Sequence, residues 1–172
     1  MKKNQDNKIK ISVVGLGYVG LPLATEFGKY FKTIGYDKNP KRIKELRNDI
    51  DINNETILNN SRRKLLSFSD KIEDISFSDI YVITLPTPIN IKNSPDTKII
   101  SDSLKLISKN IKKGTIIILE STVYPGFTEE ICAPIIQKYS KLIFNKDFYL
   151  GYSPERINPG DKKHKLVNIT KI

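Results

Sequence analysis

The chain has 172 residues, of which 38% are hydrophobic and 28% charged, a composition typical of one globular domain. Its single cysteine, Cys132, and single histidine, His164, rule out an intramolecular disulfide framework and disfavour a metal site. No stretch reaches the roughly 18 apolar residues of a membrane span, and the N-terminal segment has no cleavage pattern. We therefore expect a cytoplasmic protein with no metal, export signal or membrane insertion.

The net charge raises the question of nucleic-acid binding. Lys and Arg number 29 against 19 Asp and Glu, a formal charge of +10. A nucleic-acid site requires a clustered basic face, whereas these residues spread from Lys2 to Lys171 with only short doublets such as Arg62-Arg63. Lys also occurs with many Ile and Asn residues, and all three have codons rich in A and T. The base composition of the genome can therefore explain the excess of lysine without a ligand. We expect a solvated surface and no nucleic-acid partner.

Strand-like and helix-like segments alternate along the chain. Residues 1–7 are polar and predict a disordered tail, followed by one domain over residues 8–172. Short apolar runs rich in β-branched residues predict strands over 8–14, 33–36, 80–85, 115–119 and 148–152, with a possible strand over 65–68. Apolar residues at helical spacing predict helices over 18–30 and 100–111. Asn39 as a cap and Pro40 as a first helical residue predict a helix over 40–47, and a further helix is predicted over 128–139. The polar stretch 49–79 is assigned short helices without definite bounds. Strands this apolar are buried on both faces, so the pattern predicts an α/β fold: a doubly wound parallel sheet with helices on both faces.

A glycine motif lies between the first predicted strand and helix. Residues 15–20 read G-L-G-Y-V-G, which matches the G-x-G-x-x-G pattern in the context that it requires. Gly15 permits the tight turn, Gly17 lets a pyrophosphate approach the backbone, and Gly20 allows close packing of helix on strand. The helix N-terminus supplies amide donors. The motif predicts a Rossmann-like dinucleotide site, although another nucleotide such as FAD, or a turn that binds nothing, is an alternative.

An acidic residue accompanies the motif. Asp37 lies 22 positions after Gly15, at the end of the second predicted strand. A carboxylate there can accept hydrogen bonds from the adenosine ribose and would repel a 2′-phosphate. The sequence therefore favours NAD over NADP as the cofactor, with Lys38 and Arg42 as nearby cations that argue the other way. Asp37 could also serve only as a turn residue.

Three proline-containing loops follow later strands. They read P-T-P over 86–88, S-T-V-Y-P over 121–125 and S-P-E-R over 153–156. In doubly wound sheets, ligands bind beyond the carboxyl ends of the strands, where Thr and Glu can hold a water or relay a proton. Thr122 could equally be a helix cap, and Glu155 a solvated loop acid.

Five segments together resemble the nucleotide-sugar (UDP-glucose/GDP-mannose) dehydrogenase family: KISVVGLGYVGLPLA, GYD, TLPTP, ESTVYPG and GYSPERINPG. The segment SPERINPGDKKHKL is more similar to enzymes that act on UDP-N-acetylglucosamine or UDP-N-acetylgalactosamine than to UDP-glucose 6-dehydrogenases. The resemblance implies oxidation of the sugar C6 alcohol to a carboxylate for polysaccharide precursor synthesis. The reaction uses two NAD and passes through a cysteine-bound thiohemiacetal and thioester.

The resemblance also implies roles for individual residues. Tyr18 and Val19 would belong to the pyrophosphate-binding turn, Asp37 and Arg42 to the adenosine side, and Thr87 to a loop beside the cofactor. The remaining implied roles are NAD contact and water positioning for Thr122, the hydrolytic step for Glu155, and substrate contact for Arg156 and Ile157. Phe127 stands where relatives often carry a small hydroxyl residue, which argues against a cofactor contact there.

The resemblance covers only part of the family's enzymes. Their central helix and C-terminal domain, which carry the catalytic lysine, the nucleophilic cysteine and most of the UDP site, have no counterpart in these 172 residues. We therefore expect this chain alone to bind NAD without catalysis, the complete protein to form a homo-oligomer, and Cys132 to pack as a small hydrophobe. The alternatives are the corresponding domain of a UDP-glucose 6-dehydrogenase, a related hydroxy-acid dehydrogenase, and a stand-alone nucleotide-binding module.

Overall fold

The computed structural model describes residues 9–54, 56, 58, 64–88 and 95–154. Strands and helices alternate along the chain, as the sequence predicts. The strands are β1 (Lys10–Val14), β2 (Lys32–Tyr36), β3 (Leu66–Ser69), β4 (Ile80–Ile83), β5 (Thr115–Leu119) and β6 (Phe148–Tyr152). The α-helices are α1 (Gly20–Phe27), α2 (Pro40–Arg47), α3 (Lys98–Ser108) and α4 (Ala133–Ser140). The predicted tail at 1–7 and the residues Glu155, Arg156 and Ile157 lie outside the described residues.

The strands form one parallel six-stranded sheet in the order β3-β2-β1-β4-β5-β6. The order reverses between β1 and β4, which are neighbours in the sheet although β2 and β3 lie between them in sequence. This is the doubly wound Rossmann-like topology, and it confirms the predicted fold class. Ligands bind at such a reversal because the loops that leave the two central strands diverge to opposite faces of the sheet.

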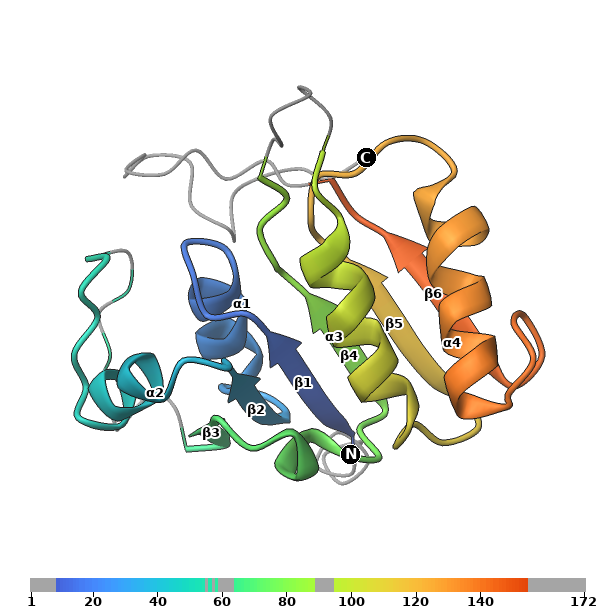
Figure 1. Ribbon diagram of the computed structural model, residues 1–172. Helices are drawn as coiled ribbons and strands as arrows, with labels where there is room; N and C mark the ends of the chain where they lie inside the picture. The colour runs from blue at the N-terminus through green and yellow to red at the C-terminus, as the bar shows by residue number, and fades with distance from the viewer. Residues whose placement is uncertain (1–8, 55, 57, 59–63, 89–94, 155–172) are drawn as a thin grey trace.

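Each face of the sheet has its own apolar core. Ile11, Val13 and Val82 pack with residues of α1 and α2, whereas Val14, Ile83 and Ile117 pack with residues of α3 and α4. In Figure 1, α3 and α4 lie in front of the sheet and α1 lies behind it. The split follows from strand geometry, since successive side chains point to opposite faces.

On the face of the sheet that carries α1 and α2, the coverage of β5 and β6 differs from the prediction. Ile116 and Tyr149, neighbours in the register of these two strands, are 38% and 45% exposed. No α-helix of the described part of the chain packs on them, because α1 and α2 cover the other end of the sheet. The two-sided burial inferred from apolar content therefore holds for the central strands and fails for this pair.

Two local features differ in detail from the prediction, which gave short helices without definite bounds over 49–79 and one regular helix over 128–139. A 3₁₀ helix, η3 (Ile72–Ile75), precedes β4, and the predicted helix over 128–139 begins with a π-helical turn, η4 (Thr128–Cys132), before α4. Pro134 lies at the start of α4. Because proline has no N–H, it interrupts the regular hydrogen-bond ladder, which gives a reason for the change of helix type at this point.

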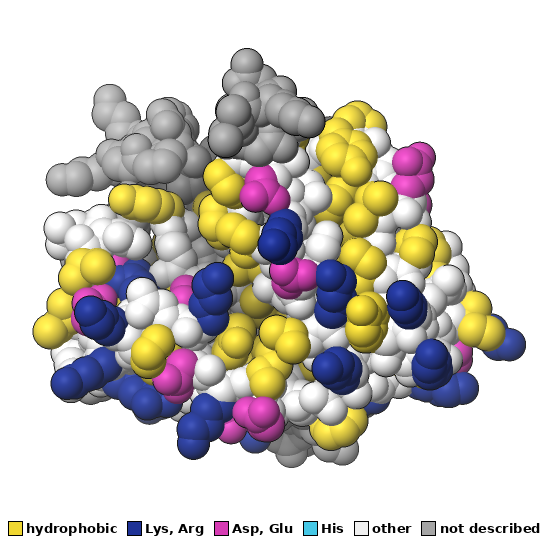
Figure 2. All heavy atoms as spheres, in the orientation of Figure 1, with side chains coloured by type: hydrophobic (Ala, Val, Ile, Leu, Met, Phe, Trp, Pro, Cys, Tyr) yellow, Lys and Arg dark blue, Asp and Glu magenta, His cyan; other side chains and the backbone are white. Residues whose placement is uncertain are grey.

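The surface shows the charge distribution that the sequence suggests. On the face in Figure 2, Lys and Arg side chains are spread widely and lie among acidic and apolar ones. No helix in the described part of the chain is long and apolar enough to cross a membrane.

Candidate dinucleotide-binding site

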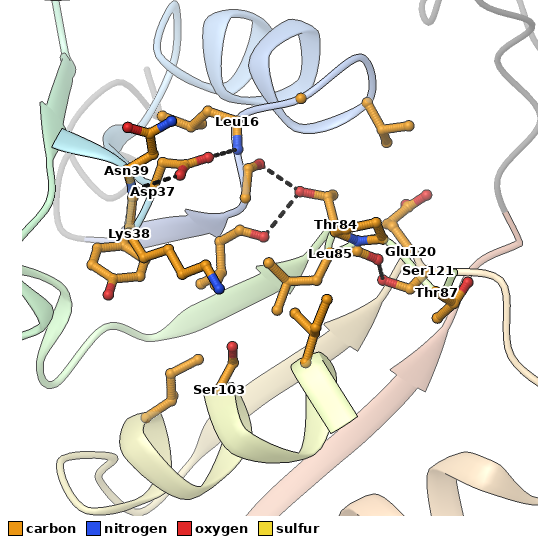
Figure 3. A pocket seen from close by; sticks show the side chains of 18 of the residues that line it. Leu16, Asp37, Lys38, Asn39, Thr84, Leu85, Thr87, Ser103, Glu120 and Ser121 are labelled. Carbon is orange, nitrogen blue, oxygen red and sulfur yellow. Dashed lines mark hydrogen bonds between the residues drawn. The ribbon is translucent and has the colours of Figure 1, made fainter. Parts of the chain in front are cut away.

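A cleft with a volume of about 660 Å³ opens at the carboxyl ends of the central strands. It is lined by the glycine turn after β1, by residues 36–39 at the end of β2, by residues 84–87 after β4, by residues 120–122 after β5, and by one side of α3. Figure 3 shows Ser103 of α3 facing the turn from across this cleft. The volume lies within the range of cofactor and ligand pockets.

The three motif glycines have different surroundings. Gly15 has φ +96°, and a Cβ there would lie 2.9 Å from the Thr84 carbonyl oxygen. A Cβ on Gly20 would lie 1.8 Å from the Gly15 carbonyl oxygen, so this glycine allows α1 to pack against the turn. A Cβ on Gly17 would meet nothing within 4 Å and Gly17 lines the cleft, so here the missing side chain leaves room for a ligand.

The start of α1 suits an anion. The helix has no side-chain cap hydrogen bond, and no acidic residue lies in its first turn. The first backbone N–H groups of a helix have no partners within the helix, and they carry the positive end of its dipole. Together with the space beside Gly17, this makes a cradle that fits a pyrophosphate.

Asp37 lies at the end of β2 with its carboxylate in the cleft. One oxygen accepts a hydrogen bond from the Leu16 N–H at 2.9 Å, and the other accepts from the Asn39 N–H at 2.9 Å. The first bond is drawn in Figure 3. An ionised carboxylate has about four acceptor positions, so Asp37 can serve as a turn residue and still accept ribose hydroxyls. Lys38 also lines the cleft.

Arg42 is placed differently from the other candidate residues. It is 7% exposed and is not among the residues that line the cleft. Its Nε donates to the Leu16 carbonyl oxygen at 3.0 Å, and its Nη2 donates to Asp51 Oδ1 at 2.7 Å. Arg42 therefore lies beneath the glycine turn and holds its backbone.

The other candidates within the described residues gather at the cleft. Tyr18, Val19, Thr87 and Thr122 line it, whereas Gly20 is buried at the start of α1. The roles for Glu155, Arg156 and Ile157 concern residues outside the described part of the chain.

Two polar side chains at the cleft, those of Thr84 and Ser103, were not singled out from the sequence, whereas Ser121 belongs to the predicted loop over 121–125. The Thr84 hydroxyl lies 3.0 Å from the Val14 carbonyl oxygen and 2.7 Å from that of Gly15, and Ser121 Oγ donates to the Leu85 carbonyl at 2.6 Å (Figure 3). Thr84 directly follows the end of β4, a position that could have identified it. Ser103 has a weaker signal, since it is one polar residue on the side of α3 that otherwise presents apolar residues to the cleft.

Comparison with known proteins decides the family. The model described as "UDP-glucose/GDP-mannose dehydrogenase family, NAD binding domain" matches residues 9–172. The chain belongs to this family. The sequence resemblance and the choice of NAD are thereby confirmed, and the cleft is that of an NAD-binding domain of nucleotide-sugar dehydrogenases.

Individual relatives agree with this assignment. The chain is 51% identical over 167 residues to a UDP-N-acetyl-D-glucosamine 6-dehydrogenase of Salmonella typhi, covering 96% of this chain and 39% of the relative. It is 48% identical to the Pseudomonas aeruginosa protein of the same name, covering 95% and 39%. The solved structure of a UDP-D-ManNAc dehydrogenase from Pyrococcus horikoshii superposes with a TM-score of 0.78 at 30% identity, covering 88% and 37%. The chain thus spans about two fifths of the length of these relatives.

Two further residues of this NAD-binding domain lie in its core, and for Cys132 this confirms the expectation that it packs as a small hydrophobe. Cys132 is fully buried in the core beside α3, and burial, with a smaller effect of the Glu129 charge, raises the pKa of its thiol to about 12. Phe127 is also fully buried and makes an edge-on contact with Tyr124, 5.3 Å between ring centroids. Among the described residues, no group of three His, Cys, Asp or Glu side chains is arranged to hold a metal ion.

Proposed function

We propose that the protein is an NAD-dependent UDP-N-acetylglucosamine 6-dehydrogenase, and that this chain supplies its cofactor-binding half. Two relatives with that name are 51% and 48% identical over almost the whole chain. The observation that carries the proposal is the cleft itself, where the space beside Gly17, the uncapped start of α1 and the Asp37 carboxylate lie together. Bound NAD would supply the hydride acceptor for oxidation of the C6 alcohol to a carboxylate.

The cleft residues divide between the two ends of the cofactor. We propose that Asp37 binds the adenosine ribose, that the backbone from Gly15 to Val19 binds the pyrophosphate, and that Thr87 and Thr122 lie at the nicotinamide end. Their order from the end of β2 to the end of β5 supports this assignment, since it follows the order of the strands across the sheet. For Glu155, Arg156 and Ile157 we propose the roles that the family resemblance implies, in hydrolysis and substrate contact.

The wider setting follows from the same proposal. The product, a UDP-N-acetylhexosaminuronic acid, would serve as a precursor of a polysaccharide, and the cytoplasm is the proposed location. We also propose that the complete protein is a homo-oligomer that binds the UDP-sugar mainly outside this chain.

Sugar oxidation by the protein in its full natural length tests the proposal. NADH absorbance is followed with UDP-N-acetylglucosamine and, as a control, with UDP-glucose. We expect two NADH per molecule of UDP-N-acetylglucosamine and little NADH with UDP-glucose, while the 172-residue chain binds NAD and forms no NADH. A strict preference for UDP-glucose, or no oxidation of either sugar, would refute the substrate assignment.

A further inference from the structure

We infer that Arg42 and Asp51 form a positioning pair that fixes the direction of the Gly17 N–H, so that Arg42 serves the cofactor through the Leu16 backbone. This inference rests on the proposed NAD-binding function of the cleft. It differs from the adenosine contact that the family resemblance implies for Arg42.

The Leu16 peptide groups are held from two directions. Arg42 Nε donates to the Leu16 carbonyl oxygen at 3.0 Å, while Asp37 Oδ2 accepts from the Leu16 N–H at 2.9 Å. Both hydrogen bonds involve a charged side chain, and such bonds are roughly twice as strong as neutral ones. The backbone that enters the second glycine of the motif is therefore fixed on both sides of Leu16.

Because the peptide bond is planar, the hydrogen bond to the Leu16 carbonyl also fixes the direction of the Gly17 N–H. The structure contains no cis peptide bond in its described part, so the Leu16–Gly17 peptide is trans and planar. In such a peptide the carbonyl of one residue and the N–H of the next point in opposite directions. Because Arg42 fixes the Leu16 carbonyl, it also directs the Gly17 N–H away from α2. Gly17 lines the cleft, and its backbone is open to a ligand there.

Asp51 fixes Arg42 in turn. The Arg42 and Asp51 side chains are 8% and 3% exposed, and Nη2 lies 2.7 Å from Oδ1. Asp51 Oδ1 also accepts from the Asn53 N–H at 3.2 Å, and Oδ2 accepts from the Thr56 N–H at 3.0 Å. The loop after α2 thus anchors a carboxylate that holds the guanidinium, and the guanidinium holds the turn.

The test uses variants that remove the hold together with both charges of the Arg42–Asp51 pair. Glu45 Oε2 lies 3.9 Å from Arg42 Nη1 and loses this neighbour, but the Glu45 side chain is 31% exposed. In the double variant Arg42→Met, Asp51→Asn, both charges are lost, and the amide oxygen introduced at position 51 can still accept from one of the two loop amides. Replacing a buried ion pair by neutral groups is often tolerated by the fold. Should the double variant fail to fold, Arg42→Lys keeps the buried charge but replaces the separate donors Nε and Nη2 with a single nitrogen, which loses the fixed geometry of the guanidinium. Arg47→Met is the matched control, because Arg47 lies on the same helix and donates at 3.2 and 2.9 Å to the Phe68 carbonyl, away from the turn.

Two measurements are made on each folded variant. The first compares the amide resonances of residues 16–18 in the nucleotide-free protein. The second compares the affinities of ADP-ribose, which contains the pyrophosphate, and of adenosine, which does not. In the Arg42 variants we expect the resonances to shift and the ADP-ribose affinity to fall about tenfold. This fall corresponds to the loss of one charge-assisted hydrogen bond, that from the Gly17 N–H to the pyrophosphate. Adenosine affinity should stay unchanged, and Arg47→Met should alter neither measurement.

The other outcomes each contradict the inference. Unchanged resonances would show that Arg42 does not set the turn, and unchanged ADP-ribose affinity would show that the turn does not need it. Equal losses for ADP-ribose and adenosine would indicate a direct adenosine contact instead. If the unsubstituted chain binds no NAD, the proposed function fails, while the nucleotide-free resonances still decide whether Arg42 positions the turn.

Discussion

At the scale of single residues, the glycines of the turn have different roles: Gly17 leaves space for the ligand, and Gly20 allows the turn to pack. Gly17→Ala places a methyl group in open space, at a position where φ lies outside the left-handed region. We expect unchanged thermal stability and a loss of NAD affinity of about tenfold or more, because the methyl group occupies space that the pyrophosphate needs. Thermal unfolding and calorimetric titration of the same preparation measure both effects.

Gly20→Ala is the matched control for that substitution. Its Cβ would lie 1.8 Å from the Gly15 carbonyl oxygen, so the backbone of the turn must move. We expect it to lower the free energy of unfolding by about 2 kcal/mol or more. Equal effects of the two substitutions on stability would contradict the distinct roles assigned to these glycines.

The buried thiol of Cys132 makes the free energy of unfolding depend on pH. Burial raises the thiol pKa from 9.0 to about 12, so the folded protein holds this proton more tightly than the unfolded chain. The resulting stabilisation is complete below pH 9.0 and is lost as the pH rises from there toward 12. The Cys132→Ala variant has no thiol and therefore lacks this pH-dependent stabilisation. The stability difference between the two proteins should therefore shrink above pH 9 by up to about 1.4 kcal/mol per pH unit, as urea unfolding measures. A difference that is constant across this range would show that the thiol ionises equally in both states.

At the scale of elements, the two ends of the sheet have different tasks. The carboxyl ends of β1, β2, β4 and β5 form the cleft, whereas the amino ends of β1 and β4 carry a buried polar network. In this network Tyr81 Oη donates to the Ile75 carbonyl at 2.7 Å, and Ser12 and Ser78 hydroxyls lie 2.7 Å apart. The network ties η3 to the start of β4 and supports stability without contact with the cleft.

Tyr81→Phe tests this division. It removes one buried hydrogen bond and leaves the Ser78 N–H without the hydroxyl acceptor 3.3 Å away. We expect the free energy of unfolding to fall by about 1–2 kcal/mol, with NAD affinity unchanged. Tyr149→Phe, at a tyrosine that is 45% exposed on β6, should change neither quantity. A loss of NAD affinity in Tyr81→Phe would show that the two ends of the sheet are coupled.

The element pattern could be predicted where local chemistry decides it. Asn39 caps α2 by accepting from the Lys41 N–H at 3.0 Å, and Pro40 follows at the first helical position, as the sequence indicates. The 3₁₀ helix η3 lies in the stretch 49–79, where the sequence predicts short helices, but its bounds and type could not be predicted because four residues give too short a period. The π-helical turn was missed because hydrophobic spacing does not distinguish it from the start of an α-helix.

At the scale of the whole molecule, the sequence is least informative about which residues from distant elements come together in space. The glycine motif and Asp37 could be identified by their spacing, and Thr87 and Thr122 by their places at strand ends. Ser103 could not, because it comes from α3 on the far side of the cleft. Nor could the burial of Arg42, since its two hydrogen-bond partners lie 26 and 9 positions away along the chain. The exposed face of β5 and β6 depends on which elements cover the sheet, which strand composition does not record.

The central claim is that the cleft binds NAD through the glycine turn and Asp37. Calorimetric titration of the chain with NAD and NADP, repeated on Asp37→Asn, tests it most directly. We predict that the unsubstituted chain binds NAD at least about tenfold more tightly than NADP, because the carboxylate accepts the ribose hydroxyls and repels a 2′-phosphate. Asp37→Asn should weaken NAD and reduce this preference. A folded chain that binds no NAD, or that binds NADP equally well, would contradict the account.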